Sequence, residues 1–180
     1  FGHGLDEDVQ GLRTLARDVP ELLVAASCSK NFGLYRERVG SLTALVRTPG
    51  QLPAVASRLK VAIRSNYSNP PAHGAAVVQQ VLCDAELRAL WVRELDAMRT
   101  RIHTMRNRFA DAMQEATQSD RFEFIRSQSG MFSFAGLSPE QVDRLRSEHA
   151  IYMVRSGRMN VAGMSEAGMP RLAAAVAQVL

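Results

Sequence analysis

The sequence predicts an α/β protein made of the end of an α/β domain, a long connecting helix and a small α+β domain. Three observations support this fold class. Two short apolar runs flank a polar loop that contains glycines, a helical pattern then runs from Asp84 to about Gln118, and short strand-like and helix-like segments follow it. The chain has 180 residues, of which 46% are hydrophobic, so a compact core is possible.

The first elements are two strands with a candidate functional loop between them. The acidic run Leu5–Asp8, followed by spaced apolar residues, predicts a helix near the start of the chain. Leu22–Ala26 is continuously apolar, which is typical of a strand buried on both faces, and Ser41–Val46 is a second such strand. The loop Ser27–Gly40 then lies at a sheet edge, where α/β proteins usually bind ligands.

Helical patterns dominate the middle of the chain. Helices are predicted at 51–63 and 74–83, and the tract Ser68–Pro71 separates them because proline locks φ and restricts the residue before it. The longest helix is predicted over 84–118, where apolar residues recur every three or four positions: Leu87, Trp91, Leu95, Met98, Ile102, Met105, Phe109 and Met113. At 1.5 Å per residue it would span roughly 50 Å, so we expect it to link two bodies.

The last third of the chain predicts a small α+β unit. Ser138-Pro139 opens a helix that runs to about His149, and residues 169–180 form a closing helix. Four strands are predicted at 122–125, 131–134, 151–154 and 159–161, the last two as a pair. The predicted boundaries are therefore 1–83 for the end of the large domain, 84–118 for the connecting helix and 119–180 for the small domain.

Composition excludes several classes of protein. No apolar run approaches the roughly 18 residues of a membrane span, and no targeting segment is evident, which favours a cytoplasmic protein. Cys28 and Cys83 lack the paired spacing of a disulfide framework or a zinc site, and the four histidines share no metal-ligand spacing. Membrane, disulfide-rich and metal-binding classes are therefore not expected.

The formal charge of +4 comes mainly from arginine, since only Lys30 and Lys60 among the 22 basic residues are lysine. Among the arginines of the long helix, four are interleaved with acidic residues around it: Arg99, Arg101, Arg106 and Arg108. This interleaving predicts a solvated helix face rather than a nucleic-acid surface.

Lys30 is the first candidate for chemistry. A lysine just beyond a buried strand is poorly placed for solvent exposure, and desolvation favours the neutral, nucleophilic amine that forms a Schiff base with a carbonyl cofactor. Neighbouring hydroxyls and Arg38 could hold an anionic group such as phosphate. The alternative interpretation is a surface lysine paired with Glu37.

Four longer motifs go beyond this local argument. They are SCSKNFGLYRERVG at 27–40, AIRSNYSNPPAHGA at 62–75, SGMFSFAGL at 129–137 and SGRMNVAGM at 156–164. In this order they closely resemble class I (fold type I) pyridoxal-phosphate aminotransferases, in the aspartate and aromatic amino acid branch. Several long motifs in register are far more specific than one short pattern. The resemblance implies the C-terminal portion of such an enzyme, with the end of the large domain that binds pyridoxal phosphate.

The resemblance implies a role for each matching residue around the cofactor. Lys30 matches the lysine that binds pyridoxal 5'-phosphate as a Schiff base and then shuttles the proton. Ser27 and Arg38 match the serine and arginine that bind the phosphate, and Ser29 is expected to support them.

Three further matches concern the substrate. Arg158 matches the arginine that binds the α-carboxylate, and Phe132 matches an aromatic residue of the substrate pocket. Arg64 matches the arginine that reaches across a homodimer interface to the distal carboxylate of a dicarboxylate substrate. The implied reaction moves the amino group of aspartate or an aromatic amino acid to 2-oxoglutarate by a ping-pong mechanism.

Other parts of the family pattern are not found in the 180 residues. They include the aspartate paired with the pyridine nitrogen and the aromatic residue stacked on the ring, which precede the matched motifs in the family. The resemblance therefore implies a homodimeric parent enzyme and an isolated chain that is inactive. A non-catalytic interaction module derived from the same family is the alternative.

Overall fold

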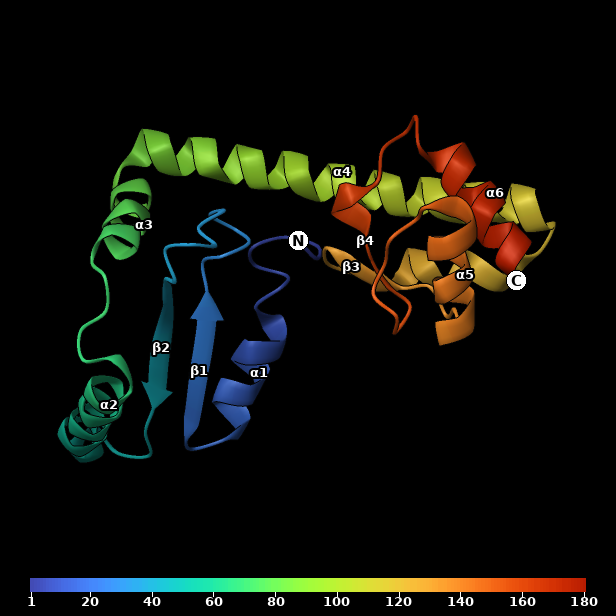
Figure 1. The fold of residues 1–180 in the computed structure, drawn as a ribbon. Helices are drawn as coiled ribbons and strands as arrows, with labels where there is room; N and C mark the ends of the chain where they lie inside the picture. Colours follow the sequence, from blue (N-terminus) through green and yellow to red (C-terminus); the bar gives the residue numbers. More distant parts are fainter. The chain divides into compact units, whose positions relative to one another are not determined.

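The computed structural model describes residues 1–180, and the chain divides into two compact units. The first unit comprises Leu5–Leu95, and the second comprises Asp96–Leu180 together with Phe1–Gly4. Helix α4, Ala85–Thr117, begins in the first unit and ends in the second (Figure 1). The predicted domain boundaries at 83 and 118 stay a prediction. None of the helices is both long and apolar enough to cross a membrane.

The first unit consists of helices around one two-stranded ladder. Strands β1 (Leu22–Ser27) and β2 (Gly40–Leu45) pair antiparallel, with Leu22 opposite Leu45 and Ser27 opposite Gly40. The remaining elements are α1 (Gln10–Asp18), η1 (Pro49–Gln51), α2 (Leu52–Tyr67) and α3 (His73–Cys83). Both predicted strands and the three predicted helices of this region are therefore confirmed, although α1 begins at Gln10, after the acidic run that was expected to open it.

The burial predicted for these strands is wrong within this chain. The sheet contains only β1 and β2, so its faces carry exposed apolar side chains, among them Leu23 at 61% and Leu42 at 48% exposure. A strand is buried on both faces only when further layers cover it. The apolar run correctly predicted the strand, but not its surroundings.

Helix α4 confirms the longest predicted helix. Its start is capped by Asp84, whose Oδ1 accepts the backbone N–H groups of Glu86 (2.9 Å) and Leu87 (3.0 Å). The apolar stripe is buried in the second half of the helix, whereas in the first half Leu95 is buried but Leu87 and Met98 are about 40% exposed. The stripe therefore belongs to the main core cluster only from Ile102 onward.

The second unit packs short elements against α4. They are η2 (Asp120–Ser127), β3 (Phe132–Phe134), α5 (Pro139–His149), β4 (Arg158–Asn160), η3 (Val161–Gly163) and α6 (Met169–Val179). Their apolar faces and α4 form one core whose members include Ile102, Met105, Phe109, Met113, Phe122, Ile125, Val142, Leu145, Val176 and Val179. Both predicted helices and the strands near 131–134 and 159–161 are confirmed.

Two predicted strands of this unit are wrong. Residues 122–125 lie in the 3-10 helix η2, where side chains three apart share a side. Phe122 and Ile125 are accordingly buried there, and Phe124 between them is exposed. Residues 151–154 form no strand, because β4 pairs antiparallel with β3 instead, with Phe134 opposite Arg158.

The prediction of a solvated face is wrong for Arg106. Its side chain is fully buried, with Nε donating to Ser133 Oγ at 3.4 Å and Nη2 donating to the carbonyl of Gly130. Nη1 has no hydrogen-bond partner. Removal from water lowers the pKa of the Arg106 guanidinium. The charge pattern failed here because Arg106 follows the buried Met105 on the core side of α4.

The capping box of α5 gives a stability prediction. Ser138 Oγ accepts the N–H of Gln141 (3.2 Å), and Gln141 Oε1 accepts the N–H of Ser138 (2.8 Å). We expect Ser138→Ala to lower the free energy of unfolding by about 1 kcal/mol, because the helix loses its cap. Ser147→Ala, at an exposed position of the same helix, should change it by less than about 0.5 kcal/mol. Urea unfolding monitored by circular dichroism measures both, and equal losses would contradict the prediction.

Candidate functional site

The loop between β1 and β2 is closed at its base by the strand ladder, at one end of the strand pair (Figure 1). Beyond the last paired residues, the N–H of Cys28 donates to the carbonyl of Val39 at 3.0 Å. A Cβ atom at Gly40 would lie 2.2 Å from the carbonyl oxygen of Ala26, so only glycine permits this pairing. The loop therefore presents its side chains from a fixed frame.

Four predicted site residues gather on this loop. Ser27 Oγ donates to Ser29 Oγ at 2.9 Å and accepts the N–H of Ser29 at 3.1 Å. The Lys30 Nζ lies 4.5 Å from the centroid of the Tyr35 ring. Arg38 adopts a left-handed backbone with φ of 50° and donates from Nη1 to the carbonyl of Tyr35 at 3.0 Å. One short loop thus combines two hydroxyls, an amine and a guanidinium.

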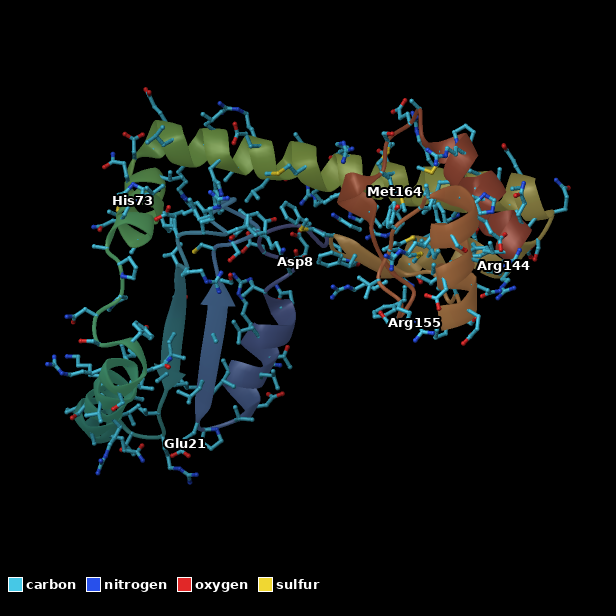
Figure 2. All side chains as sticks on the ribbon, in the orientation of Figure 1. Asp8, Glu21, His73, Arg144, Arg155 and Met164 are labelled. Carbon is cyan, nitrogen blue, oxygen red and sulfur yellow. The ribbon has the colours of Figure 1, made fainter.

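The surroundings of Lys30 differ from the expectation of a desolvated lysine. Lys30 is exposed in this chain, because the loop projects past the end of a ladder of only two strands. The Glu37 carboxylate, the partner in the alternative interpretation, accepts a hydrogen bond from His73 Nδ1 at 3.0 Å. His73 opens helix α3 (labelled in Figure 2), so this contact ties the loop to that helix.

In the second unit, the structure brings Arg158 and Phe132 together. The guanidinium carbon of Arg158 lies 4.8 Å from the centroid of the Phe132 ring. The two residues sit diagonally on the outer face of the β3–β4 ladder, a spacing that long side chains can bridge. Gly157 precedes Arg158 with φ of 81°, and a Cβ there would lie 3.0 Å from the carbonyl of Leu137.

Arg158 and Phe132 also line a cavity of about 440 Å³. Its walls are mainly apolar and include Phe109, Leu137, Ile151 and Met164. A guanidinium beside an apolar cavity can bind a carboxylate whose remaining part is apolar, because arginine donates two parallel hydrogen bonds to a carboxylate.

Arg64 belongs to a different surface. It is exposed on α2 and, together with Lys60 one turn earlier, lines a surface depression of that helix. In the first unit, the side chain is therefore available to an anion or to a partner molecule.

Residues 1–176 match the family model described as aminotransferase class I and II. The chain belongs to this aminotransferase family. The resemblance drawn from the four motifs is therefore confirmed at the level of the family.

Curated relatives place this aminotransferase chain in the same branch. It is 49% identical over 179 residues to the aromatic-amino-acid aminotransferase of Pseudomonas aeruginosa, covering 99% of the chain and 45% of that protein. It is 51% identical over 180 residues to the aspartate aminotransferase of Escherichia coli K12, covering 100% and 46%. The chain thus spans less than half the length of these relatives.

A solved structure supports the α/β fold of the aminotransferase chain. The aromatic-amino-acid aminotransferase of Burkholderia pseudomallei, covalently bound to pyridoxal phosphate, superposes with a TM-score of 0.95 at 45% identity. The match covers 100% of this chain and 45% of the Burkholderia chain.

One further residue of the aminotransferase chain, Trp91, escaped the sequence analysis as a neighbour of the candidate site. Trp91 on α4 donates from its indole Nε1 to the carbonyl of Asn31 at 2.8 Å, next to Lys30. In the sequence, Trp91 was one member of the apolar stripe. Its indole N–H was the available signal, because a partly buried tryptophan usually finds an acceptor.

Proposed function

We propose that the parent protein of this chain is a pyridoxal-phosphate-dependent aminotransferase in which Lys30 is the cofactor lysine. The donor is aspartate or an aromatic amino acid, the acceptor is 2-oxoglutarate, and the two half-reactions follow a ping-pong order. The observation that supports this proposal most strongly is that Ser27, Lys30 and Arg38 lie on one loop, called the Ser27–Arg38 loop below.

The residues of the loop fit the cofactor by their chemistry. A phosphate dianion needs hydroxyl and N–H donors and positive charge, which Ser27, Ser29 and Arg38 supply on one loop. The Lys30 amine lies on the same loop, where it can reach a carbonyl carbon and exchange a proton at Nζ. When bound, the cofactor supplies an electron sink for the charge left after removal of the substrate Cα proton.

The substrate side rests on Arg158 and Phe132. An amino acid and its 2-oxo acid share the α-carboxylate, so one bidentate arginine serves both half-reactions. The Phe132 ring under Arg158 restricts the guanidinium to one side of the ladder and leaves its donors for that carboxylate.

Arg64 extends the proposal to a homodimer. Its exposed position on α2 supports a role at a subunit interface, where it would bind the distal carboxylate of aspartate or 2-oxoglutarate in the partner's site. An aromatic substrate lacks that carboxylate, so dual specificity requires the Arg64 side chain to move aside.

Borohydride reduction tests the proposed function directly. The full-length protein is incubated with pyridoxal phosphate, reduced, digested and mapped by mass spectrometry. We expect one cofactor adduct on the peptide that carries Lys30 and none above background on Lys60, the other lysine of the chain. An unmodified Lys30 would contradict the proposal and favour a non-catalytic interaction module.

Arg158→Lys should weaken catalysis without stopping it. Lysine keeps the charge but loses the bidentate fork, so we expect kcat/KM to fall about 10- to 100-fold, mainly through a higher KM. Arg155→Lys is the matched control, because Arg155 (labelled in Figure 2) is exposed and its guanidinium pairs with the Asp143 carboxylate of α5 at 3.0 Å. Steady-state kinetics with aspartate measure both changes. Equal effects of the two substitutions would contradict the role of Arg158.

The 180-residue chain by itself is expected to be inactive. The matched motifs supply the lysine, the phosphate donors and the carboxylate-binding arginine, but no carboxylate assigned to the pyridine nitrogen of the cofactor. A coupled assay of aspartate and 2-oxoglutarate, run beside the full-length protein, measures this. A rate near that of the full-length protein would overturn the expectation.

A further inference from the structure

Both residues that follow Lys30 are held by one side chain of helix α4. The indole Nε1 of Trp91 donates to the backbone carbonyl of Asn31 at 2.8 Å. The ring of Phe32 stacks on the same indole, with centroids 4.7 Å apart and planes inclined by 15°. All three residues are half-buried, whereas Lys30 itself is exposed.

These two contacts restrict the backbone beside Lys30 in different ways. The hydrogen bond fixes the orientation of the peptide between Asn31 and Phe32, and the stacking fixes the Phe32 side chain. The turn is also closed by the N–H of Phe32, which donates to the carbonyl of Cys28 at 3.2 Å. The Cα of Lys30 lies inside this closed turn, and the two residues that follow it contact Trp91.

The Trp91 side chain suits this role because its own position is rigid. It projects from a 33-residue helix whose start is capped by Asp84. A loop anchored to a helix keeps its geometry better than a loop anchored to another loop. The Asn31 Oδ1 is buried without a hydrogen-bond partner, whereas the Asn31 backbone carbonyl accepts the indole N–H.

We propose that Trp91 is a positioning residue for the cofactor lysine. Its indole N–H and ring hold the turn after Lys30 so that the Nζ meets the carbonyl carbon of pyridoxal phosphate in a productive direction. The inference rests on the proposed function. It predicts that loss of Trp91 reduces the fraction of protein with a competent Lys30, and the apparent affinity for the cofactor falls by that fraction.

The test measures cofactor capture at Lys30 rather than turnover. The cofactor-free full-length protein is titrated with pyridoxal phosphate, reduced with borohydride at each concentration, and the Lys30 peptide is quantified against the Lys60 peptide. Trp91→Phe keeps a ring that can stack but loses the N–H donor, and Trp91→Leu loses both. We expect half-maximal trapping to need about fivefold more cofactor for Trp91→Phe, and about thirtyfold more for Trp91→Leu.

A matched substitution separates positioning from general stability. Leu95→Ala removes a buried apolar side chain one turn further along α4, and leucine can neither stack nor donate. We expect it to lower the thermal midpoint while leaving the half-maximal cofactor concentration within about twofold of the wild type.

Each outcome has a defined meaning. Wild-type concentrations for both Trp91 variants, or an equal shift for Leu95→Ala, would overturn the positioning role while the proposed function stands. A wild-type protein with no adduct at Lys30 would overturn the proposed function and this inference with it. A graded loss from Trp91→Phe to Trp91→Leu, with Lys60 labelling unchanged, supports the inference.

Discussion

Lys30→Arg in the full-length protein is expected to reduce the single-turnover rate of transamination about 10²- to 10⁴-fold. Arginine keeps the positive charge on the loop but has no amine that can bond to the cofactor carbonyl, and it stays protonated, so the general base is lost. Single-turnover conversion of aspartate by the cofactor-loaded variant, followed by absorbance, measures the effect on the chemical step.

Lys60→Arg is the control for Lys30→Arg. It makes the same chemical change at the other lysine of the chain, on helix α2. We expect its rate to stay within about twofold of the wild type, because an exposed lysine outside the Ser27–Arg38 loop has no assigned contact with the reacting atoms. A Lys30→Arg variant with the wild-type single-turnover rate would remove Lys30 from the mechanism.

Arg106→Ala is expected to be the most destabilising of the proposed substitutions, by about 2–4 kcal/mol. The Gly130 carbonyl and Ser133 Oγ lose their buried donor, and a cavity opens beside the core of the second unit. Both Arg106→Ala and Arg106→Met remove a charge that burial destabilises, which offsets part of the loss. We expect Arg106→Met to be less destabilising than Arg106→Ala, because methionine also fills most of the space left by the arginine.

Arg108→Ala provides the comparison two residues along the same helix. Arg108 is an exposed arginine whose guanidinium pairs with Glu166 at 2.6 Å on the surface, and such pairs contribute about 0–1 kcal/mol. Urea unfolding curves of the three variants give the differences. Equal midpoints for Arg106→Ala and Arg108→Ala would show that the buried contacts contribute no more than a surface ion pair.

Local patterns predicted the helices well and the short strands of the second unit less well. A helix such as α4 satisfies its backbone within itself, so the three- and four-residue spacing from Leu87 to Met113 was sufficient. A strand needs a partner, and nothing in residues 151–154 indicates that β3 pairs with Arg158–Asn160 instead. The strand predicted at 122–125 was wrong because four residues are too few to separate two patterns. Phe122 and Phe124 fit the alternation of a strand, and Phe122 and Ile125 fit the three-residue repeat of a 3-10 helix.

The residues of the candidate site also differ in how far the sequence could predict them. Lys30, Ser27 and Arg38 were found because their motif is contiguous, and the structure keeps them on one loop. Trp91 and Arg106 were missed because each acts through tertiary contact: the indole with Asn31, sixty positions away in the chain, and the guanidinium with Ser133. In the sequence, Trp91 cannot be distinguished from an ordinary core aromatic residue, nor Arg106 from an ordinary arginine on a helix surface.

The uncovered β1–β2 ladder has a consequence for how a cell would handle the 180-residue chain made alone. Exposed Leu23 and Leu42 stand on a two-stranded sheet whose outer edges carry free backbone donors and acceptors. Such a surface can pair with a strand of another molecule, and chaperones recognise exposed apolar side chains of this kind. Produced by itself, the 180-residue chain would therefore be bound by chaperones or degraded by proteases, and these processes would limit its abundance in the cell.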